Sequence, residues 1–192
     1  TRSAETAMLA TAIALLQATS LRIKNVTRLD LERHITEIRE GRSRVYRISL
    51  GGAEIKNGNA YTVLLDKQFS LLLWTYISQF RPVLSPHETP YLFPRRTGEA
   101  RDPKHFGEQI KQLIARQTGL EVHPHLVRHF TAMLYLKHRP GEYESVRRML
   151  GHSKMDTTVG FYAPLSNQHA FDVYHSEVLA PKKGGRSKRT KR

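Results

Sequence analysis

The sequence predicts an α+β domain that is mainly α-helical and carries a small three-stranded antiparallel sheet near its N-terminal third. Apolar residues recur at three- and four-residue spacing along most of the chain, which is the period of a helix with one buried face. Between residues 44 and 65 the pattern changes to alternation broken by glycine-containing turns, which is typical of short strands. A length of 192 residues suits one domain with a core of its own.

Start and stop signals bound the helices. Asp66 and Asp102 can cap the helices that follow them. Gly119 and Gly151 can end helices, because glycine accepts the left-handed conformation that often follows a last turn. We therefore expect one helix that follows Pro124, one that begins at Asp156, and others over Ala4–Thr19, Asn25–Leu31, Lys67–Phe80, Pro103–Thr118, Glu142–Leu150 and Asn167–Leu179. The proline-rich stretch Arg81–Pro103 predicts a loop, anchored by a strand-like piece at Leu92-Phe93.

The sheet is predicted from three short runs. Arg44–Leu50 alternates, and Ala53–Lys56 and Ala60–Leu65 flank Asn57-Gly58-Asn59. Asn-Gly between two extended runs is a strong hairpin signal. The three runs together predict an antiparallel sheet, with Lys56 just before the turn.

The formal net charge of +14 at pH 7 indicates a polyanionic partner, nucleic acid before an anionic membrane surface. Seven of the positive charges lie in Pro181–Arg192, which contains no acidic residue, but the rest of the chain is basic as well. The charge is spread along the chain instead of following one amphipathic helix, which argues against a membrane surface. The absence of cysteine excludes disulfides, thiolate zinc sites and cysteine nucleophiles, and it fits a reducing cytoplasm.

Six residues form the candidate site: Arg22, Lys56, His125, Arg128, His152 and Tyr162. His125 and Arg128 are three residues apart in a predicted helix, so both leave the same face. Two guanidiniums, an amine, two imidazoles and a phenol, without paired carboxylates, are the groups that a metal-free attack on a phosphodiester requires. Taken singly, Arg22 can equally be a solvated surface residue and Lys56 an exposed lysine of an edge strand.

The order of these residues resembles that of the tyrosine recombinases, the phage-integrase family. Its motifs here are the arginine of Leu21-Arg22-Ile23, the turn Lys56-Asn57-Gly58-Asn59, His125-x-x-Arg128-His129, Leu150-Gly151-His152 and Tyr162. The resemblance runs from about Ala4 to about Val178 and corresponds to the catalytic domain of that family. It implies that fold, double-stranded DNA as the partner, and strand cleavage and rejoining through a 3′-phosphotyrosyl intermediate.

The resemblance also implies roles for the six residues. Arg22 and Arg128 would hold the phosphate, Tyr162 would attack it, and Lys56 would protonate the departing 5′-oxygen. His125 is expected to exchange a proton with Tyr162, and His152 to hydrogen-bond the phosphate, whereas His129 is read as a packed, hydrogen-bonded histidine. The family most often places its tyrosine nine residues after the last histidine, which here is Phe161. Tyr162 is one residue further, so either this chain has the longer spacing or Phe161 marks a lost nucleophile.

Several alternatives stay open at this point. Glu54-x-Lys56 with Asp30 could be part of a metal-dependent nuclease site, and His123, His125 and His129 could bind zinc. A type IB topoisomerase or a telomere resolvase would use the same chemistry. A catalytically inactive DNA-binding or regulatory domain would keep the fold without the reaction.

The resemblance carries expectations about organisation. Residues 1–180 would be the catalytic domain and residues 181–192 a basic tail, without the helical N-terminal domain with which the family clamps DNA. A homotetramer on DNA is expected through the C-terminal helix Asn167–Leu179. No metal or nucleotide cofactor and no membrane are expected to take part, and the location would be cytoplasmic, at the nucleoid.

Overall fold

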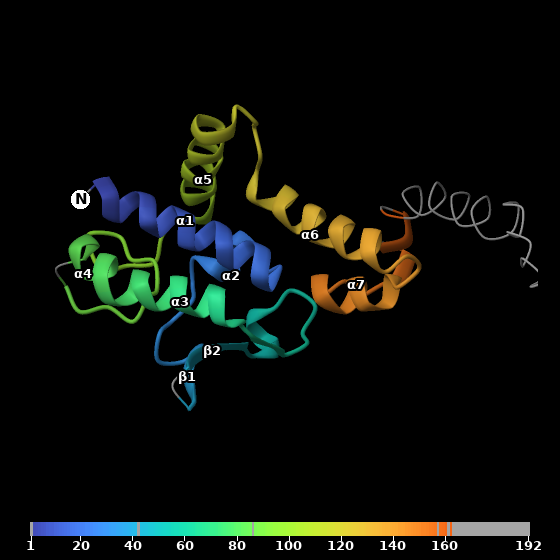
Figure 1. Ribbon diagram of the computed structural model, residues 1–192, viewed down its shortest axis with the longest axis horizontal. Coiled ribbons are helices and arrows are strands. Elements are labelled where there is room, and N and C mark those ends of the chain that lie inside the picture. Colours follow the sequence, from blue (N-terminus) through green and yellow to red (C-terminus); the bar gives the residue numbers. More distant parts are fainter. Residues whose placement is uncertain (1, 42, 86, 157, 161, 163–192) are drawn as a thin grey trace, which may run out of the picture.

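Helix α1, Arg2–Thr19, is the central element of the fold (Figure 1). Its buried residues recur at helical spacing on one side: Ala4, Met8, Thr11, Ala12, Leu15, Leu16 and Thr19. Helices from both halves of the chain pack against it, including α3, α5 and α6. The predicted helix over Ala4–Thr19 is confirmed.

The computed structural model describes residues 2–41, 43–85, 87–156, 158–160 and 162. Its further helices are α2 (Ile23–Val26), α3 (Lys67–Thr75), α4 (Arg81–Leu84), α5 (Pro103–Thr118), α6 (Pro124–His138) and α7 (Tyr143–Leu150). Residues 155, 156, 158–160 and 162 are helical as well, in line with the helix expected from Asp156. The helix predicted over Asn167–Leu179 lies outside the described residues.

The capping and terminating residues lie at the helix ends where the sequence predicts them. The Asp66 carboxylate accepts from the backbone N–H of Phe69 at 2.9 Å, and the Asp102 carboxylate accepts from His105 at 2.8 Å. Gly119 and Gly151 follow α5 and α7 in the left-handed conformation, with φ of 74° and 59°.

Two helix predictions need correction. The helix from Lys67 is α-helical to Thr75 and continues as a π-helix, η2 (Tyr76–Phe80), into α4. Pro82 has no N–H to donate four residues back, so a regular α-helical ladder cannot run through this point. The helix expected to reach Leu31 ends at Val26.

The sheet has three antiparallel strands in the order β1 (Ile35–Glu40), β2 (Ser43–Leu50) and β3 (Tyr61–Leu64). Ile35 pairs with Ile48 in β1–β2, and Leu50 pairs with Tyr61 in β2–β3. The predicted fold class is confirmed: the chain is mainly helical with one three-stranded antiparallel sheet in the described residues.

One of the three strands is not the one that the sequence predicted. Ala53–Lys56 was expected to be a strand, but the segment begins with a 3-10 turn, η1 (Gly52–Glu54), and continues as a loop to β3. A Cβ at Gly52 would come within 2.3 Å of the Gly58 carbonyl, so this loop is folded closely on itself. The third strand is β1, an edge strand whose only apolar residues are Ile35 and Ile38.

The segment Leu92-Phe93 anchors the long loop, as predicted. Both side chains are fully buried, and Leu92 donates its backbone N–H to Leu29 at 2.7 Å. Asp30 and Tyr91 form an isolated antiparallel bridge next to this contact.

The buried residues form two clusters. The larger one joins α1, the sheet, α3 and α5, and the smaller one contains Ala132, Leu136, Val146, Leu150 and Tyr162. Helix α6 extends from the first cluster, which includes Val127, to the second. The candidate site therefore lies where the two clusters meet.

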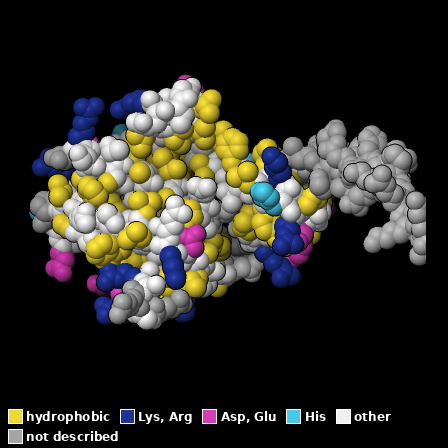
Figure 2. Space-filling model, viewed as in Figure 1, with side chains coloured by type: hydrophobic (Ala, Val, Ile, Leu, Met, Phe, Trp, Pro, Cys, Tyr) yellow, Lys and Arg dark blue, Asp and Glu magenta, His cyan; other side chains and the backbone are white. Residues whose placement is uncertain are grey.

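Charged and apolar side chains are unevenly distributed over the surface. On the face shown in Figure 2, Lys and Arg lie mainly around the periphery in separate groups, and hydrophobic side chains occupy much of the middle. None of the described helices is both long enough and apolar enough to cross a bilayer.

Candidate active site

A cavity of about 340 Å³ contains all six predicted site residues. It is lined by Arg22, Lys56, Asn57, His125, Arg128, His129, Leu150, Gly151, His152, Ser153 and Tyr162. Of the charged residues in this lining, all are basic. Segments that are far apart in the sequence thus bring two guanidiniums, an amine, three imidazoles and a phenol to one place.

Each group is held at the end of an element or in a turn. Arg22 occupies the N-cap position of α2, after the two residues that follow α1. His125 and Arg128 lie in the first turns of α6, and His152 follows the glycine that ends α7. Lys56 lies in the loop between η1 and β3. His125 and Arg128 thus share one helix, as predicted, and Arg22 lies in the junction between α1 and α2.

Arg128 is buried, with 5% of its surface exposed, and is bonded to two backbone carbonyls. Its Nη1 donates to the carbonyl of Ser20, and its Nη2 donates to the carbonyl of Leu150 at 2.5 Å. Burial, followed by the charge of Arg22, lowers the pKa of Arg128 to about 10. The guanidinium therefore stays charged at neutral pH, and three of its five N–H groups remain for other acceptors.

Ser20 is the one described non-glycine residue with a positive φ, 51°. This conformation is disfavoured for a residue with a Cβ. It ends α1 and turns the Ser20 carbonyl towards Arg128. The neighbouring carbonyl, that of Thr19, accepts from the hydroxyl of Tyr61, whose pKa burial raises to about 12. The C-terminus of α1 therefore holds both Arg128 and the first residue of β3.

His152 is fixed by the turn after α7. Its backbone N–H donates to the carbonyl of Arg147 at 3.0 Å, and Arg147 donates back to the His152 carbonyl at 2.9 Å. Its Nδ1 lies 3.0 Å from the hydroxyl of Thr158. Burial is the main cause that lowers the pKa of His152 and of His125, and the positive charges of Arg128 and Arg22 add to it. Both imidazoles are thus neutral at pH 7.

Tyr162 is 2% exposed, and its hydroxyl contacts His129. The distance from the Tyr162 Oη to Nδ1 of His129 is 2.7 Å, and the ring centroids are 5.9 Å apart. From the sequence, His129 is expected to be a packed, hydrogen-bonded residue, as it is here, and His125 is expected at this hydroxyl. Instead, His125 packs edge-on against His129 with 4.7 Å between the centroids. Phe161, the competing position for the nucleophile, lies outside the described residues.

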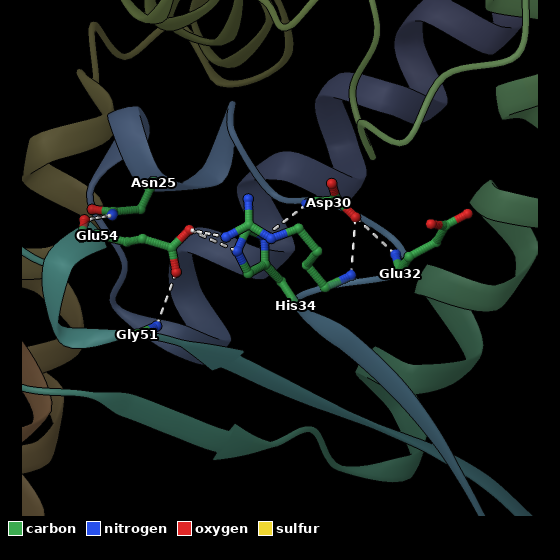
Figure 3. A network of polar contacts seen from close by, with 7 residues as sticks. Asn25, Asp30, Glu32, His34, Gly51 and Glu54 are labelled. Carbon is green, nitrogen blue, oxygen red and sulfur yellow. Dashed lines mark hydrogen bonds and ion pairs between the residues drawn. The ribbon is translucent and has the colours of Figure 1, made fainter.

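The loop that carries Lys56 is held by a network of polar contacts (Figure 3). The Glu54 carboxylate accepts from the backbone N–H of Gly51 and from Nε2 of His34, each at 2.9 Å. The Glu54 carbonyl accepts from the side-chain amide of Asn25, also at 2.9 Å. Asn25 belongs to α2, which begins directly after Arg22. The network therefore connects the segment of Arg22 with the loop of Lys56.

The tautomer of His34 follows from its two partners. The backbone N–H of Asp30 donates to Nδ1 of His34 at 2.9 Å, so the proton of the neutral ring lies on Nε2 and points to Glu54. The Gly51 N–H is the largest cause that lowers the pKa of Glu54, and His34 adds to it. Glu54 is thus an ionised acceptor at neutral pH.

The ligands that a metal site would need are engaged elsewhere. The Asp30 carboxylate accepts from the backbone N–H groups of Glu32 and Arg33, each at 2.9 Å, and Glu54 serves the network just described. In the part of the chain that the structure describes, no group of three His, Asp or Glu could hold a metal ion. The nuclease and zinc alternatives therefore lack a ligand set there.

Residues 1–169 match the Phage integrase family. The chain belongs to the phage integrase family. The tyrosine recombinase XerC of Pseudomonas aeruginosa is 28% identical over 173 residues, which cover 90% of this chain and 52% of that protein. The tyrosine recombinase XerD of Lacticaseibacillus casei is 36% identical over 103 residues, 52% of this chain and 34% of XerD. This integrase-family chain thus spans about half the length of the XerC relative that it matches.

Solved structures show the same fold. The XerH site-specific recombinase, bound to a palindromic difH substrate in a post-cleavage complex, superposes with a TM-score of 0.68 at 21% identity. The match covers 88% of this chain and 45% of XerH. The XerA recombinase has a TM-score of 0.61 at 19% identity, over 92% of this chain and 58% of XerA. The predicted tyrosine-recombinase fold is therefore confirmed.

Two residues of this integrase-family site were not predicted. Asn57 lines the cavity and approaches the turn at Gly151, where a Cβ would lie 3.2 Å from its Nδ2. The close approach depends on the folding of the loop, so the Asn-Gly signal suggested a hairpin instead. His129 was visible in the sequence, four residues after His125 on one helix face, but nothing in the sequence showed that Tyr162 would reach it.

Proposed function

We propose that this chain is the catalytic domain of a site-specific DNA recombinase, which cleaves and rejoins strands through a 3′-phosphotyrosyl intermediate. The observation that carries the proposal is the single cavity in which Arg22, Lys56, His125, Arg128, His152 and Tyr162 meet. Its cations suit a phosphodiester, and Tyr162 supplies a nucleophile. Membership of the phage integrase family supports the same reaction.

Arg22 and Arg128 hold the scissile phosphate in this proposal. The phosphate gains negative charge in the transition state, and guanidiniums that are already in place stabilise that charge without reorganisation. Arg128 is fixed by the carbonyls of Ser20 and Leu150. By analogy with donors in oxyanion holes, each arginine contributes about 10²–10³-fold to the rate. His125 and His152, neutral at pH 7, donate further hydrogen bonds to the phosphate.

The phenolic oxygen of Tyr162 attacks phosphorus and displaces the 5′-oxygen of the next nucleotide. An alkoxide is a poor leaving group, so a general acid is needed, and Lys56 protonates it. The products are a 3′-phosphotyrosyl bond and a free 5′-hydroxyl. The hydroxyl of another strand reverses the step and rejoins the DNA. Since the covalent bond conserves the energy of the phosphodiester, the cycle consumes no nucleotide.

The partners follow from the same reaction. Double-stranded DNA is the substrate, in keeping with the net charge of +14, and the XerH relative was solved on a DNA substrate. A homotetramer that exchanges Asn167–Leu179 and a tail at residues 181–192 belong to the proposal, although both segments lie outside the described residues. The location that belongs to this proposal is the cytoplasm, at the nucleoid.

The test is strand cleavage with the 192-residue chain. The probe is a pool of nicked DNA duplexes with a randomised central segment, labelled on either the 5′ or the 3′ side of the break. We expect a denaturant-resistant adduct that retains only the strand 5′ to the break, joined through its 3′ end. An adduct to the 5′ end, or none from the wild-type protein, would rule out this function.

A further inference from the structure

His129 is the described residue whose side chain touches the proposed nucleophilic atom. Its Nδ1 lies 2.7 Å from Oη of Tyr162, within hydrogen-bond distance. The imidazole is half-buried at the edge of the cavity, and α6 fixes it one residue beyond Arg128. The six proposed catalytic residues do not include His129.

We infer that His129 is a catalytic residue, the base that removes the phenolic proton of Tyr162 during cleavage. The inference rests on the proposed function. The proton moves from Oη to Nδ1 as the bond from Oη to phosphorus forms. The bond from phosphorus to the 5′-oxygen breaks, and that oxygen takes its proton from Lys56. Rejoining runs in reverse, with His129 returning the proton to Tyr162.

The environment keeps His129 able to accept a proton. Burial and the charge of Arg128 lower its pKa, so the ring is neutral at pH 7. Burial raises the pKa of Tyr162, while Arg128 opposes that rise. Arg22, Lys56, His125 and His152 line the same cavity. These cationic and neutral groups favour a phenolate, but a tyrosine so well buried still requires a local acceptor for its proton.

The proton-accepting role is distinguishable from mere positioning. The side-chain oxygen of an asparagine occupies nearly the position of the histidine Nδ1. His129→Asn therefore retains a hydrogen bond to Tyr162 but cannot take its proton. His129→Ala removes both. His138→Ala is the matched control, because His138 is exposed in the last turn of the same helix.

The experiment measures the single-turnover rate of adduct formation between pH 5.5 and 9.5. It uses the 192-residue chain and duplexes recovered from the wild-type adducts of the randomised nicked pool. We expect His129→Asn and His129→Ala to lower the rate at pH 7.5 by about 10²–10⁴-fold, the usual contribution of a general base. Their rates should rise tenfold per pH unit above pH 7, because hydroxide must then remove the proton. Wild type and His138→Ala should be flat in that range.

Added imidazole should partly restore His129→Ala and leave Tyr162→Phe inactive. A His129→Asn variant within threefold of wild type, or variants with a flat profile above pH 7, would overturn the role of His129 while leaving the recombinase function standing. Absence of any adduct from the wild-type protein would instead overturn the proposed function, and the role of His129 with it.

Discussion

Replacement of Gly151 by alanine tests whether the turn after α7 positions the loop of Lys56. Gly151 has φ of 59°, and a Cβ there would lie 3.2 Å from Nδ2 of Asn57, a tight contact. Gly119 provides a matched control, because it ends α5 with φ of 74° and a Cβ would meet nothing within 4 Å. The two substitutions thus share the backbone strain and differ in the contact with Asn57.

The magnitudes separate the two effects. A left-handed alanine costs about 1–2 kcal/mol at either position. At Gly151 the new methyl group must also displace Asn57, next to Lys56, by a few tenths of an ångström. Since a misplacement of 1 Å in an active site can cost about 10²-fold, a shift of about half that size costs roughly tenfold.

Urea denaturation and the adduct-forming rate are the two assays. We expect both variants to lose similar stability, and Gly151→Ala alone to lose about tenfold in rate. Equal rates for the two variants would refute the argument that the Gly151–Asn57 contact positions the loop. A tenfold loss of adduct-forming rate in Gly119→Ala would refute it too, because Gly119 lies outside the cavity.

Four further results are expected. Arg128→Met should lower the free energy of unfolding by several kcal/mol in urea, because two buried carbonyls each lose a charged donor worth about 1.5–3 kcal/mol; Arg22→Met, without such a pair of acceptors in the described structure, should change it far less. Lys56→Ala should slow cleavage by about 10²–10⁴-fold and recover when sulfur replaces the bridging 5′-oxygen, since a thiolate leaves without a proton; equal slowing on both substrates would contradict the acid role. In Glu54→Gln the side chain keeps one acceptor oxygen for the two donors of Gly51 and His34, so the loop of Lys56 is held less firmly. Cleavage should therefore slow less than in Lys56→Ala, and this slowing should also shrink on the sulfur substrate. A purely structural loss of activity would be the same on both substrates. Finally, the lowered pKa values of His125, His129 and His152 mean that the unfolded chain binds more protons below about pH 6.5; the urea midpoint should therefore fall as pH drops from 7.5 to 5.5, and less so in a His125→Asn/His152→Asn double variant.

Much of the fold followed from local signals. The caps at Asp66 and Asp102 and the stops at Gly119 and Gly151 depend on the chemistry of single residues, so the sequence located them well. Strand β1 was missed because an edge strand needs little apolar surface. The segment before Lys56 was misread, since its shape depends on the distant partners Asn25 and His34.

In the candidate site, too, local motifs were predictable and tertiary contacts were not. Motif order was enough to predict the six residues that share the cavity. It could not predict which imidazole Tyr162 reaches, because His125 and His129 leave the same face of α6 and only the packing of Tyr162 against α6 and α7 decides between them. The conformation of Ser20 was equally hidden, since a serine gives no sequence signal for a positive φ.

The most direct test of the central claim is to identify the residue that becomes linked to DNA. Trypsin should release the adduct as the peptide Met155–Lys182, which contains Phe161, Tyr162 and Tyr174. Fragmentation in a mass spectrometer should place the nucleotide on Tyr162, and Tyr162→Phe should yield no adduct. A nucleotide on Tyr174, or an adduct that appears only after Phe161→Tyr, would contradict the account and indicate a scaffold that has lost its nucleophile.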